Sequence, residues 1–143
     1  MNKKLTKKDS RLHEEEHFHD DWAKSININD LAVYEAFEGP VSPEYQVAIK
    51  LLGDLKNKKV LNIGCGAGEE SIYLAQKGAK VWGTDLSSGM IEVGKKLAKK
   101  FKIKKNLVFK KMDAEDLKFK DETFDLVFGN SVLHHLDDVG KAA

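Results

Sequence analysis

Residues 60–71 read VLNIGCGAGEES, a short apolar run followed by three glycines that alternate with single residues. The apolar run predicts a buried strand over 59–64, and the segment after the glycines predicts a helix over 69–77. Glycine lets the backbone turn sharply and approach a ligand closely, while the first turn of a helix presents free amide groups. This turn therefore suits a phosphate or a carboxylate, although a tight turn without a ligand has the same pattern.

The alternation of strands and helices continues after this turn. Three more apolar runs predict strands: KVWGTD (80–85), NLVFKKM (106–112) and FDLVFG (124–129). A helix capped by Ser87 or Ser88 is expected between the second and third strands, and another helix from Val132 onward. Strands that alternate with helices pair in parallel, and such sheets are covered on both faces. We therefore expect an α/β, Rossmann-like fold.

The sequence before this sheet is polar and is expected to be helical. Phe18, Trp22 and Ile26 recur at intervals of four, so an aromatic stripe lies on one helix face and either docks on the core or covers a ligand. Two further helices are expected: one over 30–37 capped by Asn29 or Asp30, and one that begins at Ser42-Pro43 and has an apolar face of Val47, Leu51, Leu52 and Leu55.

The composition limits the class of protein. The chain has 143 residues, enough for one domain with a hydrophobic core. No apolar run approaches the roughly 18 residues of a membrane span, and the charged N-terminus lacks the apolar stretch of a signal peptide. A single cysteine, Cys65, favours a reducing cytoplasm. The net charge of +1 predicts neither a membrane nor a nucleic-acid partner, and we interpret the lysine-rich segment 95–111 as a solvated surface.

A second chemical signal lies at the end of the second predicted strand. Asp85 follows Gly64 by 21 residues. An acid at this position reaches the two hydroxyls of a ribose bound across the glycine turn, although a helix cap beside Ser87 is the plainer interpretation. Together, the glycine turn and Asp85 indicate a cofactor that contains a nucleoside.

The glycine spacing distinguishes between two cofactors. The dinucleotide fingerprint is G-x-G-x-x-G, and here Glu69 occupies the third glycine position while Gly68 comes one residue early. An acid at the start of the helix would repel a pyrophosphate on the same amides. S-adenosyl-L-methionine (SAM) has no phosphates and suits this turn better. An NAD(P)-dependent oxidoreductase remains the alternative.

Three segments together resemble the class I SAM-dependent methyltransferases: VLNIGCGAGEES (60–71), VWGTDLSSGMIEVG (81–94) and KKMDAEDLKFKDETFDLVFGNSVLHHL (110–136). The resemblance covers about residues 40–143. It implies a seven-stranded sheet ordered 3-2-1-4-5-7-6, of which this sequence supplies the first four strands. We therefore expect a sheet ordered 3-2-1-4, C-terminally truncated, with residues 1–38 as a helical lid or extension and residues 39–143 as the SAM-binding domain.

The resemblance also implies roles for individual residues. The glycines would lie under the methionine part of SAM, Asp85 would hold the ribose, and Leu86 and Met90 would line the adenine pocket. Asp113 and Ala114 would bind adenine, and Asn130 would face the methyl group. The full cofactor-binding set is Asn62, Gly64, Cys65, Gly66, Gly68, Asp85, Leu86, Met90, Asp113, Ala114 and Asn130. The family usually has an acid where this sequence has Asn62, so we expect some loss of affinity.

The expected reaction is direct transfer of the SAM methyl group to an unidentified small-molecule acceptor, with S-adenosyl-L-homocysteine as the product. The catalytic residues are unknown, and the candidates are Asn130, His134 and His135. Adjacent histidines point apart, so no metal site is predicted. Trp22 and Tyr34 are expected to form part of the lid. A SAM-binding but inactive fragment or partner subunit is the other alternative, and a homodimer is expected to cover the edge of the fourth strand.

Overall fold

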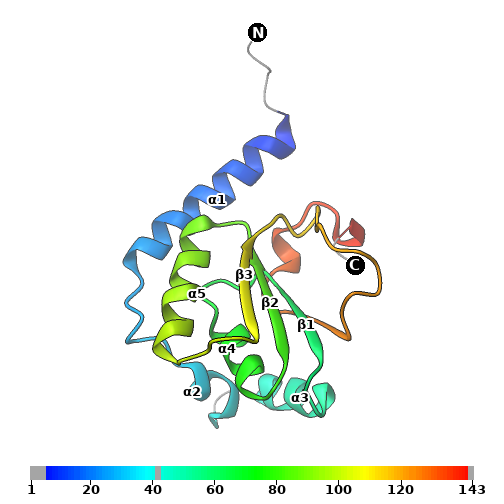
Figure 1. The fold of residues 1–143 in the computed structure, drawn as a ribbon. Coiled ribbons are helices and arrows are strands. Elements are labelled where there is room, and N and C mark those ends of the chain that lie inside the picture. The colour runs from blue at the N-terminus through cyan, green and yellow to red at the C-terminus, as the bar shows by residue number, and fades with distance from the viewer. Residues whose placement is uncertain (1–5, 41–42, 142–143) are drawn as a thin grey trace.

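The computed structural model describes residues 6–40 and 43–141. Its centre is a parallel sheet in the order β3-β2-β1-β4, as expected (Figure 1). The strands are β1 (Lys59–Ile63), β2 (Lys80–Asp85), β3 (Leu107–Lys111) and β4 (Leu126–Gly129). Because all four strands run in the same direction, their carboxyl ends meet at one edge of the sheet, where ligands bind in open α/β folds.

Helices α4 (Glu69–Gln76) and α5 (Ser88–Lys100) both contact β2 and β3 and also contact each other, so they cover the same face of the sheet. The core between this face and α4 contains Val60, Val81 and Leu74, each no more than 1% exposed. Ser87 caps α5, because its hydroxyl accepts a hydrogen bond from the Met90 amide at 3.0 Å. This confirms the first of the two predicted caps.

The opposite face of the sheet is incompletely covered, which corrects the expectation of two covered faces. The strand register places Leu61, Trp82, Val108 and Val127 in one row on that face. Val108 is 43% exposed and Val127 is 60% exposed. The aromatic ring of Phe124 packs on Trp82, with centroids 5.4 Å apart, and covers only part of the row. The prediction that a second copy covers the β4 edge stays a prediction.

Helix α1 (Lys7–Ser25) packs along α5 (Figure 1), but not through the aromatic stripe. Phe18 is 65% exposed and Trp22 is 53% exposed, so the stripe does not dock on the core, and only Ile26 packs against it. The contact is made instead by Ala23, which is buried with Met90 and Val93 of α5, and by Asp20. Asp20 Oδ1 accepts hydrogen bonds from the Ser87 hydroxyl (2.5 Å) and the Gly89 amide (2.8 Å). These bonds lower the pKa of Asp20 and satisfy free donors at the start of α5.

Two other helices differ from their predicted form. Helix α2 (Val33–Glu38) begins after Ala32 without a side-chain cap, so neither Asn29 nor Asp30 caps it. Helix α3 (Pro43–Leu52) leaves Val47 57% and Leu51 82% exposed and packs through Tyr45 and Ile49. The other half of the predicted apolar face is confirmed, because Leu55 is buried in the core and Leu52 packs against it. The predicted cap at Ser42 lies outside the described residues.

The helix expected from Val132 onward is absent from the part of the chain that the structure describes. Two short 3₁₀ turns stand there instead, η1 (Leu133–His135) and η2 (Val139–Lys141). Between them, the amide of Asp137 donates to the Glu115 carboxylate at 2.7 Å rather than to a carbonyl four residues earlier. A helix cannot propagate through an amide whose partner lies elsewhere.

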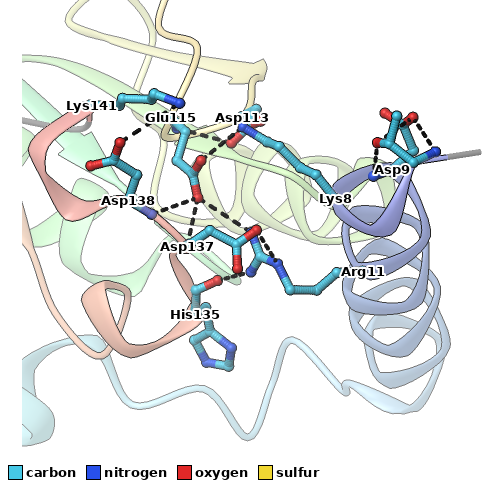
Figure 2. Close-up of polar contacts among 10 residues, drawn as sticks. Lys8, Asp9, Arg11, Asp113, Glu115, His135, Asp137, Asp138 and Lys141 are labelled. Atoms are coloured by element: carbon cyan, nitrogen blue, oxygen red, sulfur yellow. Dashed lines mark hydrogen bonds and ion pairs between the residues drawn. The ribbon is translucent and has the colours of Figure 1, made fainter.

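Glu115 ties three separate segments together (Figure 2). Its side chain is 1% exposed and accepts from Lys8 Nζ on α1 at 2.7 Å and from Arg11 Nη2 at 3.3 Å. The amide of Asp137 binds the same carboxylate. The hydrogen bond from Lys8, aided by the amides of Asp137 and Asp138, lowers the pKa of Glu115 to about 2 against the opposing effect of burial. The ionised carboxylate therefore holds α1 over the C-terminal turns.

We expect Glu115→Gln to lower the melting temperature by roughly 5 °C at pH 7, because Lys8, Arg11 and the Asp137 amide lose a charged acceptor that is itself buried. A carboxyl group whose pKa is lowered on folding stabilises above its ordinary value of 4.5 and loses that contribution as the pH falls toward 2. The difference between wild type and variant should therefore shrink below about pH 4. Circular dichroism during thermal unfolding measures this difference in melting temperature. Glu14→Gln is the control, because Glu14 is an exposed carboxylate on α1. A melting-temperature difference that stays constant as the pH falls would contradict the stabilising role of the ionised Glu115 carboxylate.

Candidate functional site

The glycine turn connects β1 to α4 in a conformation that favours glycine. Gly64, Gly66 and Gly68 have φ values of +61°, +51° and +91°. A Cβ atom on Gly68 would lie 2.7 Å from the ring of Phe109 and 3.1 Å from the Cα of Gly94. A Cβ atom on Gly66 would meet nothing within 4 Å. Gly68 therefore serves packing, whereas the backbone at Gly66 borders open space.

Asp85 joins the turn to the start of α5. Its Oδ2 accepts a hydrogen bond from the Gly66 amide, and its Oδ1 accepts one from the Ser87 amide, both at 2.9 Å. Each carboxylate oxygen can accept a second hydrogen bond. Asp85 is thus both the structural link that the plainer interpretation predicts and an oriented acceptor at the carboxyl end of β2.

A cavity of about 680 Å³ lies at the carboxyl ends of the strands, between the glycine turn, α1 and η1. It has the size of pockets that hold small molecules and cofactors. The predicted residues that line it are Gly64, Cys65, Gly66, Asp85, Leu86, Met90, Asp113, Ala114, Asn130, His134 and His135. The fold therefore brings eleven of the predicted site residues around one space, and they come from the segments at and after the carboxyl ends of all four strands.

Asn62 and Gly68 do not line this cavity. Asn62 is 0% exposed on β1, and its amide nitrogen donates to the Ser71 hydroxyl at 2.9 Å. Its Oδ1 has no hydrogen-bond partner among the described residues. Asn62 therefore lies behind the turn, where it connects β1 to α4.

Three polar side chains form one wall of the cavity. Glu70 accepts hydrogen bonds from the Tyr45 hydroxyl at 2.9 Å and from Asn130 Nδ2 at 3.0 Å, and Asn130 also contacts the Tyr45 oxygen. Burial raises the pKa of Glu70 and, together with the charge of Glu70, raises that of Tyr45, whose phenol stays protonated. We call Tyr45, Glu70 and Asn130 the polar wall. Tyr45 and Glu70 were not predicted from the sequence.

Helix α1 contributes a face of which only Trp22 was predicted from the sequence. Arg11, Leu12, Glu15, His19 and Trp22 line the cavity, and they recur at intervals of three or four residues, which is the signal that could have found them. Trp22 is a cavity-lining residue, as the lid hypothesis requires. Tyr34 is not, because its ring packs against Tyr73 and Phe101 outside the cavity, each 6.3 Å away between centroids.

Cys65 is buried in the turn, 4% exposed. Burial raises the pKa of its thiol well above the usual value, and the nearby Asp85 acts in the same direction. A protonated, enclosed thiol is a poor nucleophile. Cys65 therefore packs as a small apolar residue, in a cluster with Ile91 and Phe109.

The parallel sheet, the glycine turn and the cavity at the strand ends define a Rossmann-like domain that binds a nucleoside-containing cofactor. A family model described as "Methyltransferase domain" matches residues 61–143, which is more than half of the chain. The chain belongs to this family, the class I SAM-dependent methyltransferases, and the resemblance drawn from its motifs is confirmed.

Individual relatives agree with this assignment. The chain is 41% identical to a ubiquinone biosynthesis O-methyltransferase of Pelagibacter ubique over 85 residues, 59% of this chain and 34% of the relative. It is 34% identical to a malonyl-[acyl-carrier protein] O-methyltransferase of Hamiltonella defensa over 123 residues, 79% of this chain and 45% of the relative. The crystal structure of the YcgJ protein from Bacillus subtilis superimposes with a TM-score of 0.64 and 31% identity, covering 68% of this chain and 41% of YcgJ.

The chain thus spans between a third and a half of the length of these curated relatives. SAM is the cofactor of the family. Across residues 6–40 and 43–141, no helix combines the length and the apolar character that crossing a membrane requires.

Proposed function

We propose that this protein transfers the methyl group of SAM to an oxygen atom of a small acceptor molecule. The observation that carries the proposal is the convergence of the glycine turn, Asp85 and Asp113 on one cavity, which α1 covers. The names of the two O-methyltransferase relatives support oxygen as the acceptor atom.

The residues around the cavity fit SAM better than a dinucleotide. Glu69 and Glu70 line the cavity at the start of α4, where a pyrophosphate would meet two acids. A sulfonium and an ammonium group are compatible with these acids. Leu86, Met90 and Ala114 offer apolar contacts for adenine, and Asp113 supplies a carboxylate acceptor for its amino group.

When bound, SAM supplies an electrophilic methyl group on a positively charged sulfur. The chain's own residues would bind and align the reactants. Asp85 would accept hydrogen bonds from the ribose, and the amides of the turn would receive the carboxylate. The polar wall would orient the acceptor hydroxyl, with Glu70 as the hydrogen-bond acceptor. Trp22 and the rest of the α1 face would limit the access of water.

The direct test is transfer of radiolabelled methyl groups from SAM to a panel of small phenols and carboxylic acids. We expect labelled product with at least one oxygen nucleophile. Transfer only to amines or thiols would contradict the proposed acceptor atom. Binding of SAM without transfer to any acceptor would favour the inactive-subunit alternative.

Tyr45→Phe tests the polar wall. The variant keeps the ring contact with Phe37, whose centroid lies 4.6 Å away, and removes only the hydroxyl that donates to Glu70. We expect the turnover rate to fall about 10-fold, the effect of one hydrogen bond to a charged group, with little change in the affinity for S-adenosylhomocysteine. Equal losses in turnover and in cofactor affinity would indicate that the polar wall contacts the cofactor and not the acceptor.

A further inference from the structure

Three side chains that the cofactor does not need meet at the rim of the cavity. Glu15 and His19 lie one turn apart on α1, and His135 lies in η1. The Oε2 atom of Glu15 is 3.6 Å from His19 Nε2 and 3.2 Å from His135 Nδ1. One ligand atom from each residue lies within 4.8 Å of the other two.

These spacings suit a metal ion. Two imidazole nitrogens and one carboxylate oxygen form a common ligand set of zinc. With metal–ligand bonds of about 2.1 Å, the ligand atoms of a tetrahedral site lie about 3.4 Å apart. The two distances from Glu15 fall on either side of this value. The histidine nitrogens lie within 4.8 Å of each other, so an ion can bind between them with a small movement of the two rings.

The backbone around the three residues is already held in place. Arg11, one turn before Glu15, donates to the backbone carbonyl of His135, and its side chain pairs with Asp137 at 3.0 Å. Glu115 fixes the same turn through the amide of Asp137 (Figure 2). The ligands on α1 and η1 are therefore positioned without the ion, which reduces the ordering cost of binding one.

We propose that Glu15, His19 and His135 bind a divalent transition-metal ion of the zinc type. The ion would connect α1 to η1 across the rim of the cavity. Three protein ligands leave at least one coordination position, open to a water molecule or, if the proposed function holds, to an oxygen of the acceptor. No metal site was expected from the sequence, because the adjacent pair His134 and His135 points apart; the fold supplies the other ligands from 116 residues or more earlier in the chain.

Titration calorimetry with Zn²⁺ on the chelator-treated protein tests the proposal. We expect one ion per chain, and an affinity more than ~100-fold lower in His19→Ala, His135→Ala and Glu15→Gln, since loss of even an outer-shell partner costs ~10–100-fold. His17→Ala is the matched control, because His17 lies on α1 with 68% of its side chain exposed and outside the cluster. Binding that is absent, or that survives in all three ligand variants, would overturn the proposal.

A second measurement needs no variant. In the NMR spectrum of the wild-type protein, Zn²⁺ should shift the imidazole signals of His19 and His135 and leave those of His13 and His17 in place. Shifts confined to His13 and His17 would contradict the site. Calorimetry with S-adenosylhomocysteine on the same samples separates this result from the proposed function, because cofactor binding and metal binding are read independently.

Discussion

Asp85→Ala is expected to weaken the binding of S-adenosylhomocysteine by about 100-fold or more. The carboxylate lines the cavity, and each of its oxygens already accepts one amide hydrogen bond, so both are oriented and each keeps a free lone pair. Two hydrogen bonds from ribose hydroxyls to a charged group contribute roughly 3 kcal/mol or more, which corresponds to a factor of at least about 100.

Asp85→Ala also removes the acceptor of the Gly66 and Ser87 amides, which can destabilise the fold. The thermal stability of the variant is therefore measured together with its affinity for S-adenosylhomocysteine. Asp85→Asn keeps the shape and one acceptor oxygen, and we expect an intermediate loss of affinity from it. Asp121→Ala removes an exposed carboxylate that does not line the cavity, and it should change neither stability nor affinity. Unchanged affinity in a folded Asp85→Ala protein would refute the ribose role.

The second large effect is on stability, and it should differ between two glycines of the same turn, Gly68 and Gly66. Gly68→Ala is expected to destabilise the protein by about 2–5 kcal/mol, because a positive φ costs roughly 1–2 kcal/mol and the clash with Phe109 and Gly94 costs about 1–3 more. The Phe109 ring cannot easily move away, since it also packs against Gly83 and Gly94. The melting temperature should fall by roughly 10–20 °C.

Gly66→Ala provides the matched comparison. Its φ of +51° carries a similar backbone cost, but the added methyl group meets no atom within 4 Å. We expect a loss of only about 1–2 kcal/mol in stability. Because Gly66 borders the cavity, the methyl group should instead reduce the affinity for S-adenosylhomocysteine. Thermal unfolding of the two variants measures the difference. Equal destabilisation by Gly68→Ala and Gly66→Ala would contradict this division of roles.

The sheet and most of the cavity lining could be predicted because their signals are local. Apolar runs, glycines and helix caps occur within a few residues of one another, and parallel topology then brings Asp85, Asp113 and Asn130 to one edge. The environment of Asn62 follows from its position in a buried strand, but its contact with Ser71 depends on how α4 packs.

The orientation of α1 could not be predicted from its apolar residues. Asp20 fixes the helix through polar contacts with Ser87 and Gly89, which lie more than 60 residues away. The aromatic stripe is consequently turned partly toward solvent. The same type of long-range contact, from Glu115 to the amide of Asp137, replaces the predicted C-terminal helix with 3₁₀ turns. Hydrophobic periodicity contains no information on such partners.

Titration calorimetry with S-adenosylhomocysteine and with NAD⁺ shows which of the two cofactors the cavity binds. We expect one molecule of S-adenosylhomocysteine to bind per chain, Asp85→Ala to weaken this binding by about 100-fold or more, and NAD⁺ to produce no binding heat. Binding of NAD⁺ that depends on Asp85, with none of S-adenosylhomocysteine, would contradict this expectation.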